Sequence, residues 1–182
     1  MLFRSSLLKL IHKALSDSDI RKILGHSTKI IKYSELSQFT DLDDLLPNPT
    51  DYCIILYEDS IDHGHWVGLS RYDGKYEHFD SYGLKPDKEL EWVNFKVRRS
   101  LGQTQPFLTE LLKHKEYVYN TVKYQASEAR VNTCGSHVVH RLYRLKHQNM
   151  NLDDYHNFMQ GLKDDFNITF DMIVAEFIRK FF

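Results

Sequence analysis

The sequence predicts an α+β fold in which a central mixed β-sheet of about four or five strands is packed by helices. Strand-like segments rich in β-branched and aromatic residues occupy the middle of the chain, over residues 52–80 and again over residues 117–124. Amphipathic helical patterns fill the two ends of the chain. With 182 residues, no internal repeat and no linker-like segment, the chain is expected to form a single domain over residues 1–182.

The composition is typical of a globular protein that dissolves in water. Apolar residues make up 42% of the chain and charged residues 27%, and 24 Lys and Arg nearly balance 25 Asp and Glu. This balance does not indicate nucleic-acid binding, and no segment approaches the ~20 apolar residues of a membrane span. Two cysteines provide no disulfide framework, and the apolar run 7–13 is interrupted by charge too often for a signal peptide. We therefore expect an intracellular protein, with Cys53 as a buried structural thiol.

The secondary structure outside the centre of the sheet follows from apolar spacing, caps and chain breakers. In chain order, the expected elements are a helix over 3–14 with Leu7, Leu8 and Ile11 on one side, a helix from a Ser16 or Ser18 cap to Gly25, a strand over 29–33, helical turns over 34–46, a buried strand over 52–57, a polar connection over 58–64, a helix over 87–100, a helix after Pro106, a strand over 117–124, a helix over 134–147, and helices over 152–162 and 170–181.

The centre of the sheet is expected to be a β-hairpin over residues 65–80. Asp73-Gly74 separates two strand-like runs and favours a two-residue type I′ turn, which places Val67 opposite Asp80. Side chains alternate between faces along a strand, so His65 shares a face with Val67 and becomes a diagonal neighbour of Asp80, with β-carbons roughly 7 Å apart. A carboxylate at that distance can hold the imidazole in one tautomer and stabilise its charged form.

A cysteine lies at the start of the predicted core helix over residues 134–147. Asn132 or Thr133 can cap this helix, and Cys134 falls on the same stripe as its apolar residues. A thiol in the first turn of a helix is exposed to the positive end of the helix dipole and to free backbone N–H groups. Both favour the thiolate, and a neighbouring imidazolium would lower the pKa of the thiol further.

Together these side chains have the residue types of a nucleophilic triad. His65 is the candidate base, Asp80 the group that orients it, and Cys134 the candidate nucleophile. Attack on an acyl group also needs hydrogen-bond donors for the developing oxyanion. The backbone N–H of Cys134 and the side-chain amide of Gln125 are the candidates. Gly135 removes a side chain beside the nucleophile, which would ease the close approach of a substrate.

The segments His65-Trp66, Phe79-Asp80-Ser81, Gln125 and Cys134-Gly135 occur in an order that resembles a cysteine protease superfamily unrelated to papain. This superfamily includes adenovirus protease (adenain) and the SUMO-specific proteases, and its members share the order His, Asp or Glu, Gln, Cys. The resemblance covers roughly residues 50–147. One departure concerns Gln125, which lies nine positions before Cys134, where the family usually spaces the two more closely. Either the intervening loop contains a small insertion, or another group serves as the side-chain donor.

The resemblance implies a role for each residue. His65 would be the general base, Asp80 its partner, Cys134 the nucleophile and Gln125 the oxyanion donor. Trp66 would help to wall a narrow channel that admits small residues before the scissile bond, often Gly-Gly or Gly-X-Gly. Such an enzyme needs neither a metal nor another cofactor.

The short chain is most similar to viral maturation proteases, such as those of adenoviruses and virophages. This resemblance implies a monomer that cleaves capsid or core precursor proteins in the virion, or in the cytoplasm or nucleus of the infected cell. DNA or a peptide activator is a possible partner by resemblance only, because the net charge of −1 gives no independent support for either.

Four other interpretations remain open. A ubiquitin- or SUMO-type isopeptidase would use the same triad, although the chain lacks the length usually devoted to binding the modifier. An acetyltransferase of the same superfamily would use it as well. A scaffold or capsid-associated protein would carry an inert Cys134. Finally, His63, His65, His78 and Asp80 could form a metal site, although no CxxC pair accompanies them.

Overall fold

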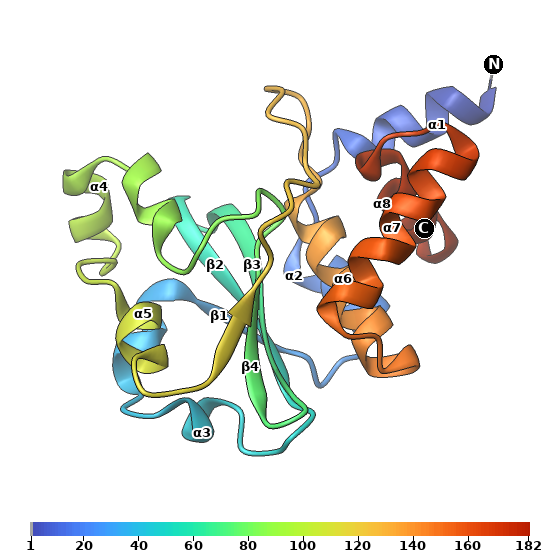
Figure 1. Ribbon diagram of the computed structural model, residues 1–182. Helices are drawn as coiled ribbons and strands as arrows, with labels where there is room; N and C mark the ends of the chain where they lie inside the picture. Colours follow the sequence, from blue (N-terminus) through green and yellow to red (C-terminus); the bar gives the residue numbers. More distant parts are fainter. Residues whose placement is uncertain (1) are drawn as a thin grey trace.

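The computed structural model describes residues 2–182, and these residues form one five-stranded mixed sheet with helices against both of its faces (Figure 1). The strands lie in chain order; β1 and β2 are parallel, as are β4 and β5, whereas β3 is antiparallel to both of its neighbours. This architecture confirms the predicted α+β class. The strands are β1 Lys29–Lys32, β2 Tyr52–Ser60, β3 His63–Tyr72, β4 Lys75–Phe79 and β5 Tyr117–Tyr119.

The sheet separates two apolar cores, because side chains of the buried strand β2 alternate between its faces. Ile54 and Leu56 belong to one core, whereas Cys53, Ile55 and Tyr57 belong to the other. The prediction of a strand buried on both faces is therefore confirmed. All five side chains are buried, and Cys53 is a buried thiol as expected.

None of the helices among residues 2–182 combines the length and apolar composition that a membrane crossing requires.

Each core is covered by its own set of helices. The Ile54 side packs against α1 Leu2–Ile11, α2 Asp17–Leu24, α6 Cys134–Gln148, α7 Leu152–Phe166, α8 Phe170–Ile178 and η3 Arg179–Phe181. The Cys53 side carries η1 Tyr33–Gln38, α3 Leu42–Leu45, η2 Lys88–Trp92 and α5 Phe107–Leu112, with α4 Phe95–Ser100 beyond them.

The central hairpin has the predicted turn and register. Asp73 and Gly74 both have positive φ, at 52° and 75°, as a type I′ turn requires. Gly68 pairs with Phe79 and Leu69 with His78, which is the register expected from that turn. The open end of this hairpin, away from the turn, lies beside the start of α6 (Figure 1).

The segment over residues 87–100 differs from the single helix that the sequence predicts. It is divided into η2 and α4, because Val93 is extended, with φ −100° and ψ 130°. Asn94 then caps α4 by accepting a hydrogen bond at 2.9 Å from the backbone N–H of Lys96. An Asn side chain that bonds the backbone in this way starts a new helix rather than continuing an old one.

Three further expectations need correction. The polar connection over 58–64 is shorter than expected, because β2 and β3 extend until only Ile61 and Asp62 join them. The strand expected over 117–124 ends at Tyr119, where the side chain of Asn120 bonds the backbone of residue 122 and forms a local turn. Leu8 is 51% exposed and points away from the core.

Helix α6 packs closely across β3 because two glycines face the contact. A β-carbon at Gly68 of β3 would lie 3.3 Å from Cγ1 of Val138, and one at Gly135 would lie 3.1 Å from Cδ1 of Trp66. Both distances are tighter than ordinary side-chain contacts, so the absent side chains allow helix and strand to approach. The N-terminus of α6, and with it Cys134, is thereby brought against the part of β3 that carries the predicted base.

Candidate active site

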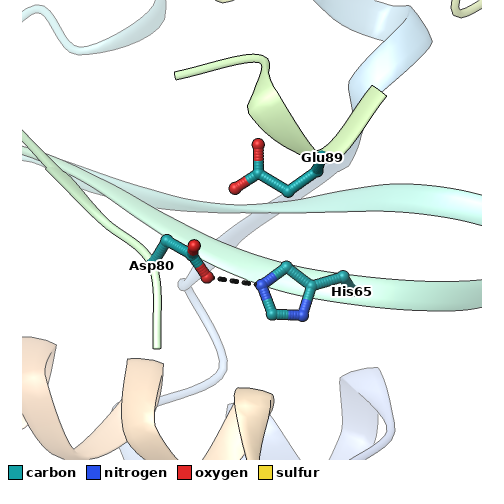
Figure 2. A group of neighbouring side chains, drawn as sticks. All are labelled: His65, Asp80 and Glu89. Atoms are coloured by element: carbon teal, nitrogen blue, oxygen red, sulfur yellow. Dashed lines mark hydrogen bonds and ion pairs between the residues drawn. The ribbon is translucent and has the colours of Figure 1, made fainter. Parts of the chain in front are cut away.

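His65 and Asp80 are brought together by the hairpin register (Figure 2). His65 lies near the start of β3 and Asp80 directly follows β4, and His65 Nε2 lies 2.6 Å from Asp80 Oδ1. A carboxylate only accepts hydrogen bonds, so Nε2 carries the hydrogen of this bond. The backbone N–H groups of Tyr82 and Leu84 also donate to the fully buried Asp80 carboxylate, at 3.2 and 3.1 Å. These contacts fix the tautomer of the imidazole and leave Nδ1 for another partner.

The other partner of His65 is the thiol of Cys134. Burial works to lower the pKa of His65, but hydrogen bonding with Asp80 and with Cys134 outweighs it, and this pKa is raised well above its ordinary value. Burial works to raise the pKa of Asp80, yet the hydrogen bond and charge of His65 hold that pKa below its ordinary value. The imidazole is therefore stabilised as a cation between two anionic partners.

Cys134 is the first residue of α6 and is 9% exposed. Burial alone would raise the pKa of its thiol, but the hydrogen bond and charge of His65 and the backbone N–H groups of Trp66 and Gly135 lower it. Cys53 shows the opposite result, because burial without such partners raises the pKa of its thiol to about 12. Of the two cysteines, only Cys134 has an environment that favours thiolate.

Gln125 is buried beside the same cleft as Cys134. Its Oε1 accepts a hydrogen bond at 2.7 Å from the hydroxyl of Ser81, and its Nε2 donates one at 3.1 Å to the carbonyl of Val131. An amide nitrogen carries two hydrogens, so the second remains available to an acceptor in the cleft. Gln125 and Cys134 thus line the same cleft although nine positions separate them in the sequence.

The cleft over these residues has a volume of about 710 Å³. Two of its walls are aromatic side chains that the sequence analysis did not identify: Tyr82 stacks on the His65 ring with centroids 5.2 Å apart, and Trp92 meets that ring edge-on at 5.9 Å. Trp66 lies deeper, at 7% exposure, and its indole N–H donates to the carbonyl of Leu15 at 3.0 Å. Tyr82 lies in an irregular loop, and Trp92 ends η2, where the helical spacing of residues 87–100 predicts an uninterrupted helix instead.

Comparison with known proteins gives one sequence relative with extensive overlap. The chain is 33% identical over 166 residues to "Uncharacterized protein V9" of Sputnik virophage, and the alignment covers 89% of this chain and 92% of that protein. The chain belongs to the same family as this virophage protein. No protein-family model matches the sequence.

Among solved structures, "SUMO protease Ulp1 with the catalytic cysteine oxidized to a sulfinic acid" aligns with this chain at a TM-score of 0.41. The sequence identity is 15%, and the alignment covers 91% of this chain and 77% of that chain. A likeness at this level does not establish a shared fold or a shared activity.

A second carboxyl group faces the His65–Asp80 pair (Figure 2). Glu89 of η2 is buried, and within the described part of the chain neither of its carboxyl oxygens has a hydrogen-bond partner. Burial and the negative charge of Asp80 raise the pKa of Glu89 to about 8. Glu89 is therefore a neutral acid near pH 7. Nothing in the sequence indicates this, because an acidic residue close to Lys88 and Glu91 is ordinarily solvated.

Among the described residues, the same three side chains form the arrangement that most resembles a metal site. The nearest ligand atoms of His65, Asp80 and Glu89 lie within 4.8 Å of one another, and neither His63 nor His78 belongs to this group. Metal–ligand bonds of about 2.1 Å keep neighbouring ligand atoms roughly 3 Å apart or more. At 2.6 Å, His65 Nε2 and Asp80 Oδ1 share a hydrogen, and an ion fits there only if that bond breaks.

Proposed function

We propose that the chain is a cysteine endopeptidase whose nucleophile is Cys134. One arrangement carries this proposal: a thiol at the start of a core helix interacts with His65, and the other ring nitrogen of His65 is bonded to the buried Asp80. This sequence of contacts is the one that nucleophilic catalysis by a thiolate requires. The predicted roles of the three residues thus define the proposed triad.

The first half of the reaction forms an acyl-enzyme. The Cys134 thiolate attacks the carbonyl carbon of the scissile peptide bond, forming a C–S bond and a tetrahedral intermediate with a negatively charged oxygen. The C–N bond then breaks, and the Nδ1–H of His65 supplies the proton that the leaving amine needs. Asp80 keeps the imidazole in place and stabilises its charge while the proton is held.

The second half hydrolyses the thioester. A water molecule attacks the acyl carbon while His65 Nδ1 takes one of its protons, and the C–S bond breaks to release the carboxylate product and regenerate the thiolate. The tyrosine and tryptophan side chains over His65 limit the access of bulk water to the ring. His65 Nδ1 therefore donates a proton in the first half-reaction and accepts one in the second.

The oxyanion would be bound by two donors on the floor of the cleft. The backbone N–H of Cys134 has no acceptor within its own helix because it belongs to the first turn. The free hydrogen of the Gln125 amide is the second donor. A single donor of this kind is worth about 3–4 kcal/mol to the transition state.

The proposed substrates are viral capsid or core precursor proteins, cleaved after small residues such as Gly-Gly. Membership in a virophage protein family supports a viral role. Trp66 lines the cleft together with Cys134, and Gly135 packs against Trp66 from the first turn of α6. We assign the reaction to the virion or to the infected cell, with the chain acting as a monomer; activation by DNA or a peptide would require a separate test.

The deciding experiment offers three substrates to the purified chain: a fluorogenic Gly-Gly peptide, a SUMO or ubiquitin conjugate of a fluorophore, and labelled acetyl-CoA with a Ser- or Lys-containing peptide. We expect turnover of the first, with loss in Cys134→Ala and full retention in the control Cys53→Ser. Turnover of the second or third alone would replace the endopeptidase with an isopeptidase or an acetyltransferase. If no substrate is turned over and iodoacetamide near pH 7 does not alkylate Cys134 preferentially, the chain would instead be a scaffold protein with an unreactive Cys134.

A further inference from the structure

The C-terminal helix α8 places a buried carboxylate behind the proposed active site. Asp171, near the start of this helix, is 4% exposed and accepts three hydrogen bonds. The donors are the backbone N–H of Ala126 at 3.1 Å, Nε2 of His137 at 3.1 Å, and the hydroxyl of Thr133, which makes the shortest contact. Burial works to raise the pKa of Asp171, but its bonds with His137 and Thr133 outweigh it and lower that pKa.

Two of these donors lie at the two ends of one loop. Ala126 directly follows Gln125, and Thr133 directly precedes Cys134. The third donor, His137, lies one turn further along α6. A single carboxylate therefore fastens the start of the loop, its end and the first turn of the helix to one point.

The other bonds of this loop do not connect its two ends in the same way. Val131 donates from its backbone N–H to the carbonyl of Glu128, within the loop itself, at 2.9 Å. The N–H of Asn132 donates to the carbonyl of Ile11 at 2.9 Å, which attaches the loop to the N-terminal helix. The bond from Gln125 to Val131 depends on where the loop places that carbonyl. Among the residues that the structure describes, Asp171 is the single group that bonds both Ala126, which follows Gln125, and Thr133, which precedes Cys134.

We propose that Asp171 is a positioning residue for oxyanion stabilisation: it fixes the Gln125 amide relative to the backbone N–H of Cys134. This inference rests on the proposed function, and it assigns the C-terminal helices a role in it. The reason is the way in which the two donors are held. Gln125 is itself held by Ser81, whose hydroxyl donates to Gln125 Oε1 at 2.7 Å and whose carbonyl accepts from the Gln125 backbone N–H at 3.0 Å. The eight-residue loop 126–133 joins Gln125 to Cys134, and Asp171 ties the two sides of this loop to one point. A buried carboxylate with three donors is a strong anchor because bonds to a charged acceptor exceed neutral ones.

The principal variant is Asp171→Asn, which keeps the size of the side chain and removes its charge. An amide has one acceptor oxygen, and its NH₂ group would face at least one of the three donors. We expect kcat for the cleaved peptide to fall about 10-fold to 100-fold, with KM nearly unchanged, because a displaced donor loses part of the 10²–10³-fold effect of an absent one. The matched control is Glu176→Gln on the same helix, a partly exposed carboxylate paired with Arg179, which should leave kcat and KM unchanged.

Two readouts separate positioning from loss of structure. The first is the alkylation rate of Cys134 by iodoacetamide against pH, which reports the thiolate and depends on His65 rather than on the oxyanion donors. The second is the affinity of a peptide aldehyde, because addition of the thiol to its carbonyl places a tetrahedral oxygen where the oxyanion forms. In Asp171→Asn we expect an unchanged alkylation profile and aldehyde binding weakened about as much as kcat falls.

A double-mutant cycle with Gln125→Ala tests the route of the effect. If Asp171 acts through Gln125, the double variant will be no slower than Gln125→Ala alone. Thr133→Val removes one donor and leaves the carboxylate in place. In Thr133→Val, kcat and aldehyde affinity should fall less than in Asp171→Asn, again with an unchanged alkylation profile. This variant replaces Asp171→Asn as the test if Asp171→Asn does not fold.

The failures of the two proposals are distinguishable. A wild-type chain without peptide turnover overturns the proposed function, and this inference with it. If the wild-type chain is active, three results overturn this inference alone: full activity in both Asp171→Asn and Thr133→Val, additive losses with Gln125→Ala, or alkylation rates that fall in parallel with kcat.

Discussion

The two halves of the candidate site are held in place by different means. His65 and Asp80 lie 15 positions apart and are joined by one hairpin, whose turn and register set their meeting. Gln125 and Cys134 are closer in sequence, yet the loop between them is fastened by Asp171, which lies 45 positions beyond Ala126. A regular strand pair transmits a position over many residues, whereas an irregular loop needs an anchor from elsewhere. Short sequence separation is therefore a poor guide to how firmly two groups are fixed.

The largest effect on turnover is expected from His65. This residue belongs to the half of the site built by the hairpin (His65 and Asp80, the hairpin half) but acts on the half at the start of α6 (Gln125 and Cys134, the helix half). His65→Ala should lower kcat/KM by roughly four orders of magnitude or more, about as much as Cys134→Ala, because the two residues act as a unit. Steady-state kinetics measure the change, and thermal melting tests that both variants stay folded. If His65→Ala kept more than a few per cent of wild-type turnover, the two halves would not function together.

Asp80→Asn tests the hairpin half alone. An amide at this position can present its NH₂ to Nε2 and stabilise the wrong tautomer of His65, so kcat/KM should fall roughly 10³-fold to 10⁴-fold. The lowered pKa of Cys134 depends on the charge of His65, so the alkylation profile of Cys134 should move to higher pH in this variant. An unchanged profile with reduced turnover would mean that Asp80 acts on substrate rather than through the imidazole.

Gln125→Ala tests the helix half alone. We expect kcat to fall about 10²-fold to 10³-fold as one oxyanion donor is lost. Unlike Asp80→Asn, this variant should leave the alkylation profile of Cys134 at the wild-type pH. Full activity in Gln125→Ala would remove this residue from the oxyanion site and leave the backbone N–H of Cys134 without its proposed partner.

Glu89→Gln is expected to have the smallest effect on turnover. It should, however, increase the free energy of unfolding near pH 8. The pKa of Glu89 is raised to about 8 in the folded chain from an ordinary value of 4.5. The folded state therefore binds a proton more tightly, and stability decreases as pH rises from about 4.5 to 8. Glutamine cannot ionise, so the variant should gain up to a few kcal/mol near pH 8, on the order of 1.4 kcal/mol per pKa unit.

Melting temperatures of wild type and Glu89→Gln from pH 5 to 9 measure this difference. The control Glu91→Gln, two residues away and exposed, should follow the wild-type curve. Parallel curves for wild type and Glu89→Gln would mean that Glu89 is ionised in the folded chain and has found a partner for its charge.

The sequence was sufficient for the parts of the molecule that follow a regular period. The Asp73-Gly74 turn and the strand alternation predict the pairing of β3 with β4, and helical spacing predicts α6 with Cys134 in its first turn. Both patterns repeat over many residues, so one irregular position does not alter the result. The same reasoning predicts the buried strand β2 and a serine cap, Ser16 or Ser18, at the start of α2, where the structure has Ser16.

The parts that could not be predicted are those decided by single side chains in irregular segments. Asn94 divides the expected helix over 87–100, and Asn120 ends β5 early. Glu89 and Asp171 have unremarkable sequence neighbours and gain their environments only through tertiary packing. A single sequence contains no signal for such contacts, because their partners lie far away along the chain.

Because Asp171 follows the hairpin by a long stretch of chain, the two halves of the site are also completed in a fixed order during synthesis. A ribosome releases the hairpin long before it releases α8, so the base and its carboxylate can be assembled while the last helices are still being translated. Asp171, which ties both sides of the 126–133 loop together, follows later in the chain. A chain shortened before Asp171 would therefore keep the His65–Asp80 pair but lose this attachment.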